Sequence, residues 1–230
     1  MTIYIITLCD KNNIDKTHFL KASIENNYKL IILPTYDIKL GNLSKIYKTY
    51  HYLLNCHDIQ DDDLVCVVDA FDLIYNKNTK VVDLYKTFIE QKRDIIISSE
   101  TKFSHHDACV KKYYDLLGDN YKNKYPNSGC IIAYKKSYLV MFGDIINLIE
   151  NKTIDISHSK SDQRVLSYYI CNYKTNKLNI GIDYNNIFCT TVNTEYTQNL
   201  SSIQSPFIHV TFLKHHNQTK KYDSLIDIYR

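Results

Sequence analysis

The 230-residue sequence is poor in glycine. It has only five glycines and contains neither a G-x-G-x-x-G run nor a G-x-x-x-x-G-K-[ST] run. Both motifs need glycines to bring backbone N–H groups against a phosphate. Their absence excludes a dinucleotide fingerprint and a P-loop, so any bound phosphate has to be held by a metal ion or by lysine.

The sequence also lacks the segments that direct a chain to a membrane or out of the cell. No apolar run reaches the roughly 18 residues of a membrane-spanning helix. The first residues, Met1 to Leu8, have no basic stretch, which argues against a secretory signal peptide. The seven cysteines form no C-x-x-C pair, so we expect reduced thiols rather than a zinc site or a disulfide framework.

Neither sign of charge is in excess. Lysine and arginine total 28 and aspartate and glutamate 25, which is too balanced for a general nucleic-acid-binding protein. The abundant residues are 30 Ile, 25 Lys, 21 Asn and 21 Tyr. All four have A/T-rich codons, so this composition indicates a genome bias rather than a binding surface.

Short apolar runs alternate with segments of helical periodicity. The sequence predicts strands over 3–8, 28–33, 64–68, 94–98, 130–134, 178–182 and 207–211, and helices over 16–27, 44–56, 79–92, 136–150 and 162–171. Buried strands that alternate with helices predict a single α/β domain with a mostly parallel central sheet flanked by helices.

Two aspartates follow the apolar strand 64–68, in Asp69-Ala70-Phe71-Asp72. Spacing alone says little, because the sequence has two Asp-x-x-Asp pairs, about as many as chance gives for its aspartate content. Ligands of such sheets bind beyond the carboxyl ends of the strands, and two close carboxylates favour a divalent cation. The alternative is a capped turn with a solvated Asp72. A haloacid-type phosphatase does not fit, because it needs aspartates two residues apart.

His209 lies in the predicted strand 207–211. A single histidine on an apolar strand is more often a core residue with its hydrogen bonds satisfied. An imidazole with two carboxylates and phosphate oxygens would, however, suit Mn²⁺. The pattern leaves both interpretations open.

Six short motifs follow one another along the chain: Val67 to Ile74, Ser98 to Glu100, Asn127 to Tyr134, Ser161 to Gln163, Asp183 to Phe188, and Ile208-His209. In content and order they resemble the glycosyltransferase domain at the N-terminus of the collagen lysyl hydroxylases and its giant-virus relatives. The resemblance covers about residues 1–215.

The resemblance implies one GT-A (Rossmann-like) domain over 1–230. Residues 1–125 would form the nucleotide- and metal-binding half, and 126–230 the sugar and acceptor half with the C-terminal metal-ligand strand. It also implies metal-dependent transfer of glucose or galactose from a UDP-sugar to a hydroxyl, with retention of configuration. The expected acceptor is hydroxylysine or galactosyl-hydroxylysine of a collagen-like protein.

The same resemblance assigns roles to individual residues. Asp69, Asp72 and His209 would hold Mn²⁺. Uridine would lie over Thr7 to Asp10, and Lys45 and Lys214 would add positive charge near the phosphates. The catalytic residues, on the sugar and acceptor side, would be Asp162, Glu100 and Asn127.

Two departures from the family pattern keep other functions open. The segment from His209 to Lys214 is one residue shorter than its counterpart and lacks its glycines, and the family's acidic run is reduced to Asp162. A non-catalytic relative that binds a sugar nucleotide or a glycan is one alternative. A nucleotidyltransferase of related fold is another, disfavoured because no glycine-rich loop follows the first strand.

The expected partners are a UDP-sugar and a collagen-like or other glycoprotein acceptor, with no nucleic acid; a homodimer stays open. The expected location is the cytoplasm of an infected or AT-rich host cell, or a virion.

Overall fold

The computed structural model describes residues 2–9, 17, 21, 28–34, 39–76, 84–103, 108–115, 121–172, 177–192 and 203–211. Its strands are β1 (Ile3–Cys9), β2 (Lys29–Pro34), β3 (Leu64–Val68), β4 (Leu73–Tyr75), β5 (Ile95–Glu100), β6 (Tyr125–Tyr134), β7 (Ile180–Ile182), β8 (Cys189–Val192) and β9 (Phe207–Val210). Its helices are η2 (Gly41–Leu43, a 3-10 turn), α2 (Ser44–Asn55), α3 (Leu84–Glu90), α4 (Ala108–Asp115), α5 (Lys135–Glu150) and α6 (Asp162–Asn172).

The strands form one sheet in the order β2-β1-β3-β6-β5-β8-β9-β4, with β7 beside β5. Five of the strand pairings in the described chain are parallel. The other three are antiparallel and involve β6 and β4. The prediction of a single α/β domain with a mostly parallel sheet is confirmed.

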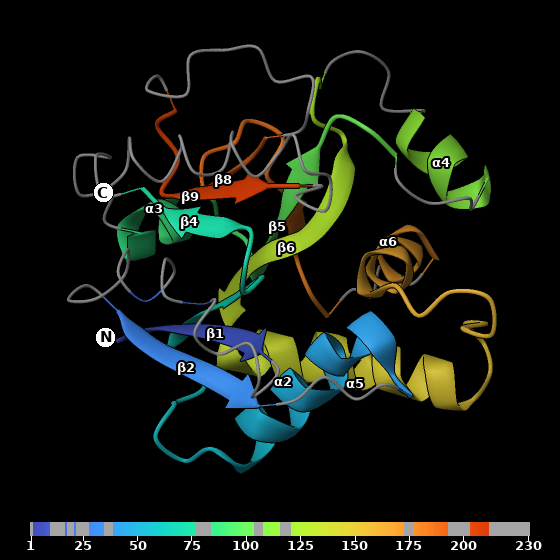
Figure 1. Ribbon diagram of the computed structural model, residues 1–230, viewed down its shortest axis with the longest axis horizontal. Coiled ribbons are helices and arrows are strands. Elements are labelled where there is room, and N and C mark those ends of the chain that lie inside the picture. The colour runs from blue at the N-terminus through green and yellow to red at the C-terminus, as the bar shows by residue number, and fades with distance from the viewer. Residues whose placement is uncertain are drawn as a thin grey trace.

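The sheet has to curl, because a very short link joins two strands that stand far apart in its order. β3 is third and β4 eighth, which is about 24 Å across a flat sheet. The chain from Val68 to Leu73 reaches only about 17 Å when fully extended. Figure 1 shows β4 and β9 folded back above β1. This curl brings β9 to the turn that follows β3.

Side chains of the central strands alternate between two apolar layers. In β3, Val65 and Val67 belong to the layer covered by α2, α5 and α6. Leu64, Cys66 and Val68 belong to the layer that contains Leu84 and Phe88 of α3. Figure 1 shows α2 and α5 side by side below β1, and α3 near β4. With both faces buried, β3 can be apolar throughout, as the sequence pattern indicated.

Most predicted elements are found within a few residues of their expected bounds. The predicted helix 16–27 lies outside the described residues apart from Thr17 and Lys21, and the predicted helix 79–92 is described only from residue 84. β6 begins five residues before its expected start at 130. The sequence did not predict α4 or the short strands β4 and β8, which lack a long apolar run.

Two further expectations concern cysteines and membranes. Six cysteines are described as free thiols: Cys9, Cys56, Cys66, Cys130, Cys171 and Cys189. Among the described helices, none has the length and apolar character that crossing a membrane requires.

Candidate active site

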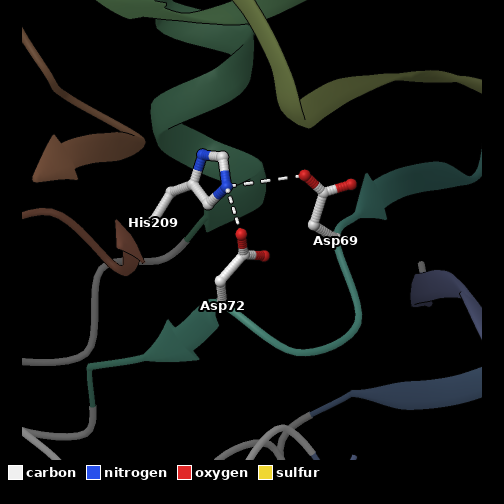
Figure 2. Close-up of side chains that lie close together, drawn as sticks. All are labelled: Asp69, Asp72 and His209. Atoms are coloured by element: carbon white, nitrogen blue, oxygen red, sulfur yellow. Dashed lines mark ion pairs between the residues drawn. The ribbon is translucent and has the colours of Figure 1, made fainter. Parts of the chain in front are cut away.

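Asp69, Asp72 and His209 meet at the carboxyl end of β3. Asp69 directly follows the strand, and Asp72 precedes β4, which pairs with β9 so that Leu73 faces His209. The Val210 N–H donates to the Asp72 carbonyl at 2.7 Å and locks this register. His209 Nε2 lies 3.4 Å from Asp69 Oδ2 and 3.5 Å from Asp72 Oδ2. Figure 2 shows both carboxylates pointing at this nitrogen.

This arrangement fits a divalent cation better than it fits a satisfied core histidine. His209 is buried, yet neither of its ring nitrogens has a hydrogen-bond partner. A buried imidazole without partners is costly, and its distances to the two carboxylates are longer than good hydrogen bonds. One ligand atom from each of the three residues lies within 4.8 Å of the others. Two carboxylate oxygens and an imidazole nitrogen are ligands that Mn²⁺ accepts.

Charge at this cluster is set by the neighbours of each group. Burial acts to lower the pKa of His209, but Asp72 and Asp69 outweigh burial and raise it to about 9. Burial acts to raise the pKa of Asp72, but His209 outweighs it and holds the pKa below its usual value. Without a cation, the imidazole is therefore protonated and balances part of the carboxylate charge.

Lys45 of α2 joins one of these aspartates to Asp162. Its buried ammonium lies 2.6 Å from Asp69 Oδ1 and 2.8 Å from Asp162 Oδ2. It also donates to the Ser128 carbonyl at 3.0 Å, so three oxygens surround its three N–H donors. Burial acts to lower the pKa of Lys45, but Asp162 and Asp69 outweigh it and hold the pKa above its ordinary value. Lys45 therefore stays charged.

Asp162 occupies the first turn of α6. Ser161 Oγ accepts the Arg164 N–H at 3.2 Å and so caps the helix. An apolar stripe on the helix is buried, formed by Val165, Leu166, Tyr169 and Ile170. The packed stripe and the cap direct Asp162 and Gln163 toward the cavity.

Glu100 and Asn127 form a second polar group in the cavity, together with Gln163. Asn127 Nδ2 donates to Glu100 Oε2 at 3.3 Å, and Gln163 Nε2 donates to Glu100 Oε1. Sequence reasoning did not assign Gln163 a role of its own. The feature that could have indicated a role for Gln163 is its position beside Asp162 in the first turn of a capped helix.

An irregularity of the sheet brings Asn127 into this position. Ile97 pairs with Ile131, but Ser99 pairs with Pro126. An advance of two residues along β5 therefore corresponds to five residues along β6. The extra residues of β6 bulge at the end of the strand, as is common beside functional sites. The Gly129 N–H donates to Asn127 Oδ1 at 2.8 Å and fixes the amide.

One cavity of about 650 Å³ joins the two polar groups. It lies within the roughly 300–1,000 Å³ typical of small-ligand sites. Among the predicted site residues, those that line it are Lys45, Asp69, Asp72, Glu100, Asn127, Asp162 and His209.

Of the other three predicted site residues, only Thr7 is described, and it does not reach the cavity. Thr7 is fully buried, donates Oγ1 to the Val68 carbonyl at 2.9 Å and does not line the cavity. Of the stretch expected to lie under uridine, Leu8 and Cys9 line the cavity and Thr7 does not, because Thr7 lies further from the carboxyl end of β1. Asp10 and Lys214 lie outside the described residues.

The curled α/β sheet is that of the GT-A glycosyltransferases, as two solved structures show. A glycosyltransferase involved in the glycosylation of the major capsid of PBCV-1 superposes with a TM-score of 0.63 at 9% identity, over 99% of this chain and 100% of that chain. An active-site mutant of LgtC superposes with a TM-score of 0.55 at 12% identity, over 98% of this chain and 95% of that chain.

The family model of the PLOD GT domain matches residues 9–218, and the chain belongs to that glycosyltransferase family. Family and fold together support glycosyl transfer, and the GT-A fold suggests a nucleotide-sugar donor and a divalent metal.

A curated relative of another kind is the Mediator of RNA polymerase II transcription subunit 5 of Debaryomyces hansenii, 24% identical over 133 residues. That match covers 49% of this chain, and the chain spans only 13% of the subunit. A partial match of this extent defines neither a family nor a site.

Proposed function

We propose that this chain transfers a hexose from a UDP-sugar to an acceptor hydroxyl in a Mn²⁺-dependent reaction. One observation carries the proposal. The metal-ligand cluster around His209 and the carboxylates Asp162 and Glu100 line the same cavity, so a donor bound through its diphosphate would extend its sugar toward them. A Mn²⁺ ion held by Asp69, Asp72 and His209 would supply Lewis-acid stabilisation of the diphosphate as UDP departs.

The protein side of this chemistry is the orientation of charge. Lys45 fixes Asp69 in place and adds a permanent positive charge beside the region proposed for the diphosphate. It also fixes Asp162, whose carboxylate oxygen Oδ2 it holds 2.8 Å away at the wall of the cavity. Such a carboxylate can stabilise positive charge that develops on the sugar ring.

The ion pair also bears on stereochemistry. A general base must reach and take the acceptor proton, and Asp162 Oδ2 is already engaged by the Lys45 ammonium at 2.8 Å. Asp162 therefore suits charge stabilisation better than deprotonation of the acceptor. We propose that transfer retains the anomeric configuration.

For the acceptor, we propose hydroxylysine or its galactosyl derivative on a collagen-like protein, with UDP-glucose or UDP-galactose as donor. The support is the family to which the chain belongs and the resemblance of its six motifs to the collagen-modifying members.

The deciding experiment measures UDP release from a panel of UDP-sugars, with a hydroxylysine-containing peptide and its galactosylated form, in Mn²⁺ or in EDTA. We expect release with one or two donors, only with metal, and an anomeric signal of retained configuration by NMR. An Asp72→Asn variant should be inactive, whereas Lys136→Met, on the exposed start of α5, should match wild type. UDP binding without release for every donor would instead support the non-catalytic alternative.

A further inference from the structure

A second cavity, of about 340 Å³, lies beside the edge strand β7. Its walls come from β7, the turn 183–188 that follows it, the segment just after α3, and residues of α4 and α6. None of its lining residues lines the metal cavity. It is at the lower end of the volumes at which small ligands bind.

Two tyrosines form an aromatic surface in this cavity. Tyr121 and Tyr184 stack with ring centroids 4.2 Å apart and planes inclined by 21°. Tyr121 is 38% exposed, although large apolar side chains of the described chain are mostly buried. A stacked, accessible phenol pair offers a large rigid surface with hydroxyl groups at its rim.

Planar polar side chains stand around the aromatic pair. Arg93 crosses Gly181 so closely that a Cβ there would lie 3.1 Å from Arg93 Cγ and 3.3 Å from its Nε. The Arg93 guanidinium donates to Asn179 Oδ1, which fixes its plane. Gln91 and Asn185 add amide groups to the lining.

The backbone around the cavity is held in uncommon conformations. Among the described residues other than glycine, Lys92, Lys152 and Asn186 have positive φ, and two of the three flank this cavity. Such conformations are found more often at binding sites. The turn is further fixed by Asp183, whose carboxylate accepts the N–H groups of Ile187, Phe188 and Cys189 at 2.8–2.9 Å.

β5 connects this cavity to the metal cavity. Ser99 Oγ donates to the Asp183 carbonyl at 2.7 Å, and the next residue, Glu100, lines the metal cavity. Two successive residues of β5 thus contact the walls of different cavities: Ser99 bonds to the turn of the second cavity, and Glu100 lines the metal cavity.

We propose that this second cavity binds a saccharide unit of the acceptor. A sugar ring presents a face of C–H groups, which packs on aromatic rings, and a rim of hydroxyls, which pair with amide and guanidinium groups. Tyr121 and Tyr184 supply the aromatic surface for the C–H face, and Arg93 and Asn185 supply polar groups for the hydroxyls. The role as an acceptor site rests on the proposed function, whereas saccharide binding itself can be tested without it.

The test is saturation-transfer NMR on the full chain in EDTA, without donor, using glucose, galactose, lactose and maltose as probes. We expect saturable binding of at least one sugar, weakened at least fivefold in Tyr121→Ala and in Arg93→Ala. Asp72→Asn, in the metal cluster, and Leu54→Ala, an exposed apolar control on α2, should bind as wild type does. Thermal unfolding confirms that each variant is folded, and Tyr121→Phe gives a milder change that keeps the stacked ring.

Three results would overturn the inference: no saturable binding of any sugar to folded wild type, binding unaffected by both Tyr121→Ala and Arg93→Ala, or competition of the sugars by uridine at this cavity. Because the assay contains neither metal nor donor, its failure leaves the proposed transfer standing. Failure of the UDP-release assay likewise leaves sugar binding standing.

Discussion

Gly129 shows how a missing side chain decides where a functional one lies. A Cβ at this position would lie 2.1 Å from His209 Cε1, 2.3 Å from its Nδ1 and 2.8 Å from Asn127 Oδ1. All three distances are shorter than real Cβ contacts, so the imidazole or the amide would have to move. The small residue leaves room for the proposed metal ligand.

We therefore expect Gly129→Ala to weaken Mn²⁺-dependent UDP binding at least about tenfold and to reduce the free energy of unfolding by roughly 1–3 kcal/mol, as overpacked sites do. Gly143→Ala on α5 is the matched control, since its new methyl would meet Tyr50 at 3.3 Å, far from the cluster. Calorimetric titration with UDP checks both variants. Wild-type affinity in Gly129→Ala would contradict the assignment of His209.

Asp162 is the residue at which catalytic and structural roles can be separated. Ser161, not Asp162, caps α6, so Asp162 is not needed as the N-cap. The ion pair with Lys45 nevertheless gives Asp162 a part in stability, because its loss leaves the Lys45 ammonium with one carboxylate fewer.

For Asp162→Asn we expect a loss of about 1–3 kcal/mol in stability, intact Mn²⁺-dependent UDP binding, and transfer reduced at least about 100-fold. Asp144→Asn is the control. Asp144 of α5 accepts a hydrogen bond at 3.0 Å from the hydroxyl of Tyr169, which lies on α6 like Asp162, but Asp144 does not line the cavity. Steady-state rates well below the melting temperature compare the two. If Asp162→Asn transfers sugar within threefold of wild type, the residue is structural.

At the scale of elements, a buried lysine pins the connection between α2 and β3. Lys135, the first residue of α5, is only 8% exposed and donates Nζ to the carbonyls of Cys56 at 2.8 Å and Ile59 at 2.7 Å. These two bonds hold the end of α2 against α5. The helix that carries Lys45 depends on this attachment.

Lys135→Met should lower the free energy of unfolding by roughly 2 kcal/mol, because it removes the charged donor from two carbonyls. Its neighbour Lys136 offers a control, since it is exposed and its ion pair within the described chain is with the exposed Asp62. Lys136→Met should change stability little, as exposed ion pairs contribute little. Urea denaturation measures the free energy of unfolding of both variants. Equal losses of stability would show that the hydrogen bonds of Lys135 to Cys56 and Ile59 do not contribute.

At the scale of the whole molecule, the His209 cluster couples stability to pH. Without metal, the pKa of His209 is raised to about 9 from 6.5, chiefly by Asp72 against the opposing effect of burial. Its contribution, on the order of 3 kcal/mol, is therefore fully present below pH 6.5 and lost as pH rises through about 9. The stabilisation by metal binding depends on pH in the opposite direction, because a metal binds the neutral imidazole and displaces its proton.

We expect stability in EDTA to fall between pH 6.5 and 9, while the stabilisation gained from Mn²⁺ grows between pH 6 and 8. Denaturation curves with and without metal measure both slopes. His209→Asn should flatten the pH dependence of stability both with and without metal. His57→Asn, at an exposed site, should alter neither pH dependence. Parallel slopes in the presence and absence of metal would argue against His209 as a ligand.

The sequence by itself determined the order of elements and the chemistry at the ends of the strands. The apolar run Leu64 to Val68 predicted a strand buried on both faces, because only such a strand can be apolar at every position. Asp69 had to leave that strand at a ligand-binding edge. The helical periodicity of residues 162–171 predicted α6. These are local consequences of periodicity, and they hold in the structure.

Only the tertiary structure decided which of these residues meet. His209 is 137 positions beyond Asp72 in the chain, and the curl of the sheet alone brings β9 beside the Asp69–Asp72 turn. The ion pair of Lys45 with Asp162 depends on α2 and α6 covering the same face, and the place of Asn127 depends on the β6 bulge. Thr7 is buried because β1 packs beside β3, where its hydroxyl donates to the Val68 carbonyl. Sequence patterns fix which face of an element is apolar, whereas distances between elements follow from how their side chains pack together.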